Sequence, residues 1–214
     1  MPRGRLITIE GLDGAGKSTL ARALARELAA RGSAVEVLRE PGGVALSERI
    51  RALVKDPALS VAARAEALLY AAARAQLVEE RVRPLLEQGA SVILDRYVDS
   101  SLAYQGGGRR LGVGEVRAIN LFATHNLEPD RTLLLRVSPA VGRARLEGRA
   151  LAEGAAGDRL EREGEAFFAA IADAYEELAL LEPERIRTLD ASQPPELVLQ
   201  EALAVVDDLF RSDP

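Results

Sequence analysis

Residues 11–18, Gly-Leu-Asp-Gly-Ala-Gly-Lys-Ser, match the Walker A pattern of loops that bind phosphate groups. The apolar run at 6–9 predicts a buried strand before this loop, and residues 19–28 have the periodicity of an amphipathic helix after it. Strand, glycine-rich turn and helix in this order are the context that the motif requires. The glycines allow successive N–H groups to face one anion, Lys17 can reach the β- and γ-phosphates, and the Ser18 hydroxyl can ligate Mg²⁺. The alternative, a glycine-rich surface turn, does not require those two flanks.

The rest of the chain alternates short apolar runs with longer helical patterns. The expected strands are 5–10, 34–38, 91–95, 131–137 and 185–189, and the expected helices are 17–31, 44–55, 61–88, 113–125, 139–150, 161–182 and 194–211. This alternation predicts an α/β fold of the P-loop NTPase type, a three-layer α/β/α sandwich with a five-stranded parallel sheet. The 214 residues are expected to form a single domain, 1–214, in which Pro84 can kink the third helix.

Composition excludes several classes of protein. The chain has no cysteine, which excludes disulfides, thiolate metal sites and a cysteine nucleophile. Its net charge of −5 predicts no general attraction to nucleic acid, and no apolar run is long enough to cross a membrane. The first strand follows the start of the chain closely and leaves no room for a signal peptide, so we expect a cytoplasmic protein.

Ligands of a parallel sheet bind beyond the carboxyl ends of the strands, so the residues that follow each strand are candidates for chemistry. Glu40 and Pro41 follow the second strand, in either a binding turn or a plain strand-to-helix loop, and the sequence leaves the isomer of their peptide bond open. Asp95 ends the third strand in the position of a Walker B aspartate, which holds Mg²⁺. Arg96 beside it can pair with a phosphate, although a surface Asp-Arg pair is the alternative.

Other stretches carry groups suited to a nucleotide. Tyr70 and Arg74, four residues apart on one expected helix, can stack on a base and hydrogen-bond it, or can be a boundary aromatic residue and a solvated charge. Residues 99–110 offer hydroxyls, an amide and an aromatic ring to a ligand, or form a surface loop. Weak apolar periodicity beyond residue 148 predicts a mobile lid, bounded at 143–162, whose arginines can stabilise phosphoryl transfer or form a solvated basic helix end.

In combination, these motifs resemble those of bacterial thymidylate kinases. The resemblance covers essentially the whole chain and rests on the Walker A loop, Arg39-Glu40-Pro41-Gly42-Gly43, Tyr70 with Arg74, Asp95-Arg96-Tyr97, the run from Asp99 to Gly106, and Asp158-Arg159-Leu160-Glu161. It implies transfer of the γ-phosphoryl group of ATP to dTMP, giving dTDP and ADP, with Mg²⁺ as cofactor and a homodimer as the assembly.

Three other functions are the alternatives to this one. Another P-loop nucleoside monophosphate kinase is the nearest of them. A GTPase switch is disfavoured because the Asn-Lys-x-Asp guanine motif is absent, and a P-loop motor on nucleic acid is disfavoured by the acidic charge balance.

The resemblance also implies roles for the matching residues. The ATP phosphates are expected at Gly11, Leu12, Asp13, Gly14, Ala15, Gly16, Lys17, Ser18 and Thr19. Mg²⁺ is expected at Ser18 and Asp95, and Lys17 and Asp13 are expected to act in catalysis. The acceptor dTMP is expected at Glu40, Pro41, Arg51, Tyr70, Arg74, Arg96, Ser100, Ser101, Tyr104 and Gln105. Because position 14 is glycine, the arginine that some members carry in the P-loop is missing here, and the catalytic arginine is expected on the lid, at Arg145 or Arg149.

Overall fold

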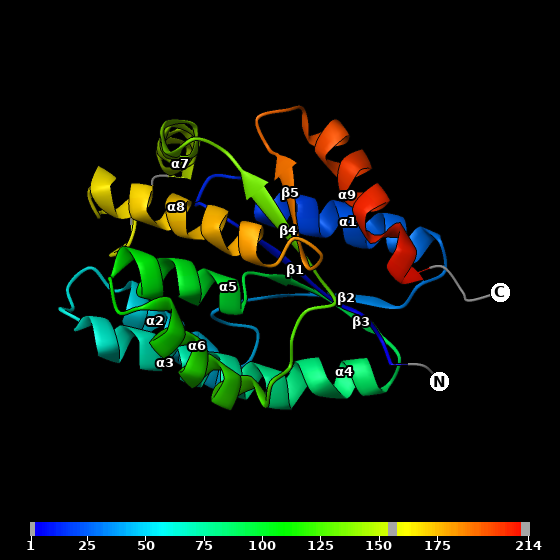
Figure 1. Ribbon diagram of the computed structural model, residues 1–214, viewed down its shortest axis with the longest axis horizontal. Helices are drawn as coiled ribbons and strands as arrows, with labels where there is room; N and C mark the ends of the chain where they lie inside the picture. Colours follow the sequence, from blue (N-terminus) through cyan, green and yellow to red (C-terminus); the bar gives the residue numbers. More distant parts are fainter. Residues whose placement is uncertain (1–2, 154–157, 211–214) are drawn as a thin grey trace.

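Five parallel strands in the order β2-β3-β1-β4-β5 form the centre of the molecule (Figure 1). The computed structural model describes residues 3–153 and 158–210, and the side chains of all of these except 149–153. All five predicted strands are confirmed, each within one residue of its expected ends. The strands are β1 (Leu6–Gly11), β2 (Val35–Arg39), β3 (Ser91–Asp95), β4 (Arg131–Arg136) and β5 (Ile186–Asp190).

The register of the strands brings three functional turns to one edge of the sheet. Ile9 of β1 and Arg39 of β2 both pair with Asp95 of β3, so these three strands end at the same level. The loop after β1, the turn after β2 and the loop after β3 therefore emerge side by side. This carboxyl edge is where sheets of this kind bind their ligands.

The helices agree with the predicted ones within four residues at each end, except over 61–88. They are α1 (Lys17–Ala30), α2 (Ala45–Lys55), α3 (Ala63–Leu77), α4 (Arg83–Glu87), α5 (Val98–Ser101), α6 (Val113–Thr124), α7 (Pro139–Glu153), α8 (Glu165–Leu181) and α9 (Pro195–Phe210). Within the described part of the chain, no helix combines the length and the apolar character that a membrane span needs.

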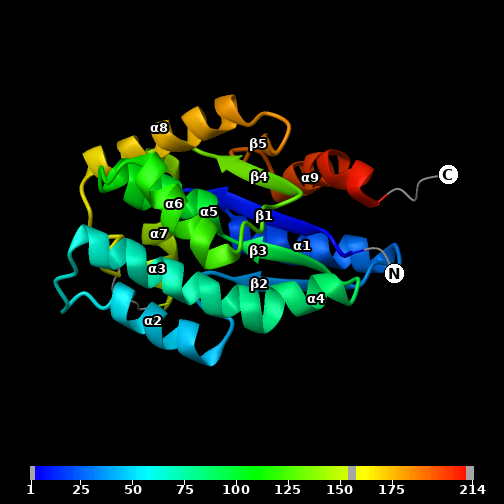
Figure 2. The same cartoon turned by 60° about the horizontal axis from the view of Figure 1, so that its bottom comes forward.

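The helices cover both faces of the sheet (Figures 1 and 2). α1 and α9 lie on one face, where their buried leucine, alanine and valine side chains pack on β1 and β4. α4, α5 and α8 cover the opposite face, with α3 packed between α2 and α6 further out. The result is the three-layer α/β/α sandwich that the alternating pattern predicts.

The predicted helix 61–88 is divided into three parts. α3 passes into a π-helical turn, η1 (Val78–Val82), before α4 begins. Pro84, near the start of α4, has no N–H to bond the carbonyl of Glu80. The change of helix type therefore lies next to the residue at which a kink was expected.

The interpretation of residues 99–110 as a surface loop is wrong for most of the segment. Here α5 continues into a second π-helical stretch, η2 (Leu102–Gly108), whose first five residues are buried. The weak helix propensity of the glycines is overridden because they allow α8 to approach closely. A Cβ atom added at Gly107 would lie 2.7 Å from the Cβ of Ala174, and one at Gly108 would lie 2.7 Å from the ring of Phe167.

The predicted lid consists of a helical part and a turn. α7 ends at Glu153, three residues beyond its expected end, so 143–153 are helical. Residues 154–157 lie outside the described residues, and the chain from Asp158 onward packs as a turn against α2 and α3. The following helix, α8, begins at Glu165, four residues later than expected.

Candidate active site

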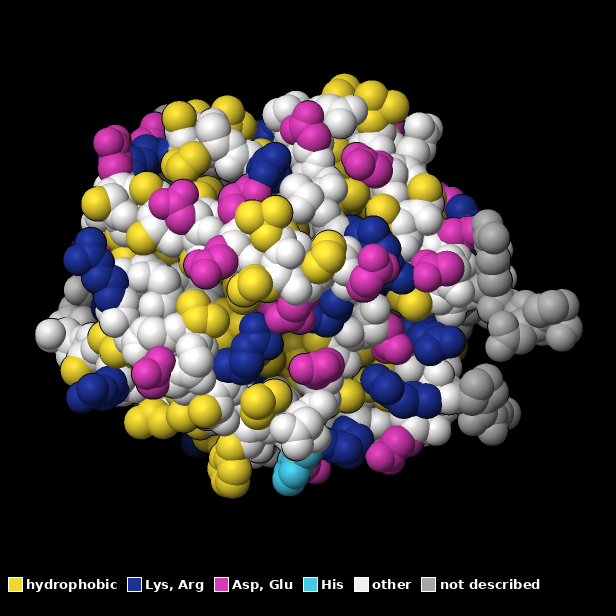
Figure 3. Space-filling model, viewed as in Figure 1, with side chains coloured by type: hydrophobic (Ala, Val, Ile, Leu, Met, Phe, Trp, Pro, Cys, Tyr) yellow, Lys and Arg dark blue, Asp and Glu magenta, His cyan; other side chains and the backbone are white. Residues whose placement is uncertain are grey.

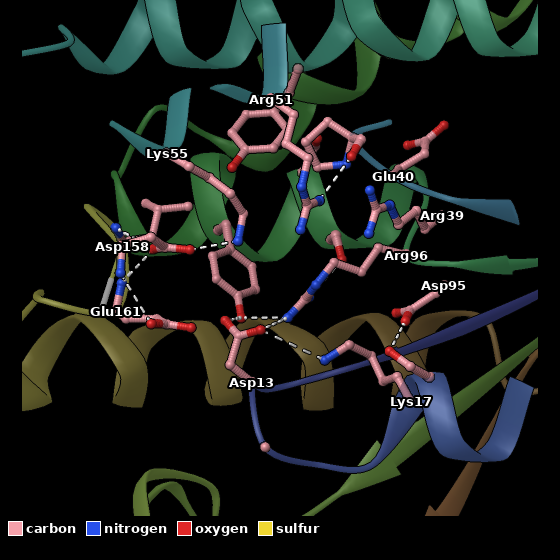
Figure 4. A pocket seen from close by; sticks show the side chains of 18 of the residues that line it. Asp13, Lys17, Arg39, Glu40, Arg51, Lys55, Asp95, Arg96, Asp158 and Glu161 are labelled. Carbon is pink, nitrogen blue, oxygen red and sulfur yellow. Dashed lines mark hydrogen bonds and ion pairs between the residues drawn. The ribbon is translucent and has the colours of Figure 1, made fainter. Parts of the chain in front are cut away.

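A cavity of about 640 Å³ opens at the carboxyl edge of the sheet. Its floor is the P-loop and the ends of β1 and β3, and its walls come from α2, α3, η2, α7 and the turn at 158–161. Figure 4 shows charged side chains from both halves of the chain pointing into this space. The sequence-predicted residues that line it are Asp13, Gly14, Gly16, Lys17, Ser18, Thr19, Glu40, Pro41, Arg51, Tyr70, Arg74, Asp95, Arg96, Ser100, Ser101, Tyr104, Gln105 and Arg145.

Lys17 lies at the N-terminus of α1, folded back over the P-loop. Its ammonium group donates to the carbonyl oxygens of Gly11 at 3.1 Å and Leu12 at 2.8 Å. Burial, together with the nearby charge of Arg96, lowers the pKa of Lys17 to about 8. A phosphate in the loop would supply the negative charge that this buried ammonium lacks, since among the described residues only Asp13, 3.9 Å away, forms an ion pair with it.

The P-loop and the start of α7 touch through two glycines. A Cβ atom at Gly14 would lie 2.2 Å from the carbonyl oxygen of Gly142, and one at Gly142 would lie 2.7 Å from the carbonyl oxygen of Asp13. Gly14 also has a φ of 80°, which side chains rarely adopt. An arginine at position 14 would therefore force α7 away from the loop, whereas glycine allows the helix that carries Arg145 and Arg149 to approach it.

Asp13 connects the P-loop to the acceptor side of the cavity. Its carboxylate accepts hydrogen bonds from Arg96 at 2.7 Å and from the Tyr104 hydroxyl at 3.0 Å. Burial disfavours its ionisation, but Arg96 and Lys17 outweigh this and hold the pKa of Asp13 well below its usual value. Figure 4 shows Asp13, Lys17 and Arg96 converging on one region, so a lysine from the start of α1 and an arginine that follows β3 share one carboxylate.

Arg96 is connected through the hydroxyls of Ser100 and Tyr175 to a buried carboxylate, Glu10, which sequence reasoning missed. Glu10 accepts the backbone N–H of Tyr97 at 2.7 Å and the hydroxyl of Tyr175 at 2.9 Å. The Ser100 hydroxyl also donates to Glu10, at 2.5 Å, and accepts from Arg96 at 2.9 Å. Sequence did contain an indication of this role, because Glu10 is a charged residue inside the apolar first strand. A buried strand tolerates such a charge only when hydrogen-bond or ion-pair partners compensate it.

The Ser18 hydroxyl and the Asp95 carboxylate form a pair of oxygen donors beside the P-loop, and the hydroxyl donates to the carboxylate. Hard oxygen ligands of this kind fit Mg²⁺, which usually keeps several waters and takes one or two carboxylates from the protein. No cluster of three or more acidic or histidine ligands occurs among the described residues. The pair therefore fits an ion that a phosphate group also ligates, rather than a site built by protein alone.

Arg74 and Glu40 form a buried ion pair in the half of the cavity where the acceptor dTMP is expected. The Glu40–Pro41 bond is cis, and Arg74 Nε donates to Glu40 at 2.6 Å. The guanidinium also donates to Ser101, to Asn120 and to the backbone carbonyl of Tyr97. Four of its five N–H groups are thus used, and the second N–H of Nη2 has no partner among the described residues.

Glu40 is predicted to make folding stability depend on pH. Burial raises the pKa of Glu40 to about 7, although Arg74 opposes the shift, and its Oε1 has no hydrogen-bond partner in the described structure. Between its ordinary value of 4.5 and pH 7 the folded state then binds more protons than the unfolded chain, so the unfolding free energy falls as pH rises through this window. Glu40→Gln should remove up to about 3 kcal/mol of this fall.

Urea unfolding of both proteins at pH 5 and pH 8 measures the effect. The exposed substitution Glu87→Gln is the control and should change nothing. An equal pH dependence in wild type and Glu40→Gln would contradict the assignment.

Other side chains line the part of the cavity where the acceptor is expected. Tyr70 presents its ring to the cavity from α3, and burial raises the pKa of its hydroxyl. Arg51 donates to the carbonyl oxygen of Pro41 at 2.8 Å, which holds its guanidinium beside the cis turn. Ser101 and Gln105 enter from η2. These residues, widely separated in sequence, therefore lie around one cavity.

Of the two candidate catalytic arginines on the lid, only Arg145 has a side chain among those that the structure describes. Arg145 lines the cavity and donates to the carbonyl oxygen of Ala191 at 3.1 Å. Arg149 lies one helical turn further along α7, and its side chain is outside the described residues. Of the other arginines in the predicted lid cluster, Arg159 contacts Glu66 and the carbonyl oxygen of Val54.

Several lining residues had no role in the sequence prediction. Lys55 bonds Asp158 at 2.5 Å across the mouth of the cavity, as Figure 4 shows, and Arg39 and Glu161 also line it. The sequence did point to these residues. Arg39 directly precedes Glu40, and Lys55 is one of only two lysines in the chain. Asp158 and Glu161 belong to one of the motifs shared with thymidylate kinases. What sequence could not indicate is that the turn at 158–161 reaches α2.

A P-loop, an oxygen-donor pair for a cation and a second polar pocket, all at one edge of a parallel sheet, define a P-loop nucleotide-binding domain with room for an acceptor. The family model described as thymidylate kinase matches residues 9–202. Proteins named thymidylate kinase are 49% identical in Bifidobacterium longum (91% of this chain, 93% of the relative) and 44% identical in Deinococcus radiodurans (97% and 98%). A third, from Lactobacillus helveticus, is 44% identical over 96% of both chains. The chain belongs to the thymidylate kinase family.

Proposed function

We propose that this enzyme transfers the γ-phosphoryl group of ATP to dTMP, giving ADP and dTDP, within the cavity described above. The observation that carries the proposal is the convergence of Lys17, on the P-loop, and Arg96, on the acceptor side, around Asp13. A cation for the donor phosphates and a cation for the acceptor phosphate lie on either side of one carboxylate. This arrangement brings two phosphate groups close enough for direct transfer.

The reaction needs no side-chain nucleophile. The dTMP phosphate oxygen is already anionic and attacks the γ-phosphorus in line, so the protein positions both partners and neutralises charge. Lys17 serves the ATP phosphates, while Arg96 and Arg51 hold the phosphate of dTMP. Asp13 pairs with both Lys17 and Arg96 and so offsets part of the repulsion between their charges.

Ser18 and Asp95 would hold Mg²⁺ in this scheme. When bound, the ion neutralises charge on the β- and γ-phosphates. Arg145 or Arg149 on α7 would add positive charge on the transferring group.

The acceptor base would lie against Tyr70, whose ring can stack on thymine. The remaining N–H of Arg74 would donate to a thymine carbonyl, and Ser101 and Gln105 would meet the base edge. Glu40 and Pro41 would support this wall through Arg74 and Arg51.

Tyr104 is predicted to exclude ribose nucleotides. Its ring is buried edge-on against Phe167, and its hydroxyl is fixed by Asp13 and Arg96, so the side chain cannot yield to a 2′-hydroxyl. Tyr104→Ala should reduce the preference for dTMP over its ribose analogue by about 10-fold or more, measured as the ratio of kcat/KM values. An unchanged ratio would count against this role.

A panel of nucleoside monophosphates with ATP, followed by coupled detection of ADP, tests the proposed function. The expected result is a much higher kcat/KM for dTMP than for dCMP, dAMP, dGMP or CMP. Preference for another monophosphate would instead assign the chain to a different kinase specificity within the same fold.

We also propose a homodimer formed through α3 and α6. These helices pack side by side and expose Phe122 (88% exposed) and Leu68 (58%). Figure 3 shows apolar side chains gathered at the lower left of the molecule, where α3 and α6 lie in Figure 1. Sedimentation equilibrium should then give twice the chain mass of 22.9 kDa, and a monomer mass would reject the dimer.

A further inference from the structure

Glu66, in the first turn of α3, is a fully buried carboxylate outside the wall of the cavity. Its Oε1 accepts a hydrogen bond from Nε2 of Gln105 at 2.9 Å. Gln105 itself lines the acceptor half of the cavity. A charged group behind the wall is thus bonded directly to a side chain that faces the ligand.

The other contacts of Glu66 hold it in one position. Arg159 donates to Oε2 at 2.6 Å, and Arg109 donates to the same oxygen at 3.1 Å. Both arginines are fixed in turn, since Arg159 also bonds the carbonyl oxygen of Val54 at 3.0 Å and Arg109 pairs with Glu163 at 2.6 Å. Rotation of the Glu66 side chain would break several charge-assisted hydrogen bonds in a buried site.

The carboxylate decides which end of the Gln105 amide is available to a ligand. It offers only oxygen acceptors, so the group of Gln105 that faces it is the NH₂. The amide is planar, and its carbonyl oxygen Oε1 therefore points to the other side. Among the described residues nothing donates to this oxygen. Glu66 thus takes one of the two N–H groups of Gln105 and keeps the carbonyl oxygen, an acceptor, turned toward the base.

We propose that Glu66 is a positioning residue that makes the base pocket select a pyrimidine with a protonated ring nitrogen, an inference that rests on the proposed dTMP function. Thymine and uracil carry N3–H, which can donate to the Gln105 carbonyl. Cytosine has an unprotonated N3, which would place two acceptors against each other in a buried site. A pocket built on one such hydrogen bond rejects a base that cannot form it far more strongly than shape alone allows.

The substitution Glu66→Gln tests this role. A glutamine at position 66 can present its own NH₂, which allows the Gln105 amide to turn over and offer a donor to the base. The kcat/KM preference for dTMP over dCMP should fall by at least about 10-fold, through the KM of the monophosphates, with the KM for ATP unchanged. Glu66→Asp retains an acceptor-only group and should keep most of the preference.

Glu163→Gln is the matched control, because it removes the other carboxylate on Arg109 without touching Gln105. It should leave the dTMP to dCMP preference as it is. An unchanged preference in Glu66→Gln, or an equal fall in Glu163→Gln, would overturn the proposal. Failure of the wild type to phosphorylate dTMP would contradict the proposed function instead.

A second measurement does not depend on the variants folding. In the wild type without nucleotide, the Gln105 side-chain amide should give a ¹H–¹⁵N signal in which one Nε2 proton exchanges slowly with D₂O, because it is bonded to a buried carboxylate. Rapid exchange of both protons would overturn the orientation, whatever substrate the enzyme uses.

Discussion

Lys17→Ala should lower kcat for dTMP phosphorylation by about 10³-fold, the largest effect of any single substitution in the P-loop. The ammonium lies at the N-terminus of α1 and is buried against the loop carbonyls, so no other side chain of the loop can bring positive charge to the ATP phosphates. Steady-state kinetics with saturating dTMP measures the loss. Both kcat and the KM for ATP should worsen, because Lys17 is expected to contact the ATP phosphates in the bound ground state as well as in the transition state.

Binding of dTMP alone is the control for Lys17→Ala. Arg96 keeps its bonds to Asp13 and Tyr104 when the lysine is removed, so the Kd for dTMP should change less than about threefold. If dTMP binding is lost as completely as turnover, the lysine stabilises the whole pocket, and its assignment to the ATP phosphates is wrong.

Arg149→Ala should lower kcat by at least about 10²-fold, because arginines that stabilise the transferring group act on this scale or above. The close contact of Gly14 with Gly142 brings the start of α7 onto the P-loop, and Arg149 lies two turns further along that helix. KM values for both nucleotides should change little, since the interaction forms mainly in the transition state.

Arg145→Ala is the informative comparison for Arg149→Ala. The Arg145 guanidinium is already bonded to the carbonyl of Ala191, so its removal should cost less, about 10-fold. The reverse order, with the larger loss in Arg145→Ala, would move the catalytic role to Arg145.

The fold was predictable because its signals are local. Five apolar runs of strand length and the amphipathic helices between them predict a parallel sheet, and the register then brings the turns after β1, β2 and β3 to one edge. The segment 98–108 was not predictable in this way. Its serines and glycines favour a loop, and its helical form depends on packing against α8, a helix more than 50 residues further along the chain.

The candidate site divides in the same way. Asp95 ends a strand, and Asp13 and Glu40 follow strands, all within recognisable motifs, so their place at the sheet edge follows from topology alone. Glu10 and Glu66 act through partners that are distant in sequence, Tyr175 and Arg159, and no single-chain pattern identifies such pairs. Sequence therefore predicts the residues that line the cavity better than the buried carboxylates behind them.

Direct transfer from ATP to dTMP within one cavity can be followed through the fate of the γ-phosphoryl group. The wild-type enzyme is incubated with ATP labelled with ³²P at the γ position and with dTMP, and the products are separated. Direct transfer should place the label in the β-phosphate of dTDP, with ADP and dTDP formed in equal amounts and little inorganic phosphate. Label that appears chiefly in inorganic phosphate, or chiefly in the diphosphate of another nucleoside when a second monophosphate is supplied beside dTMP, would contradict it.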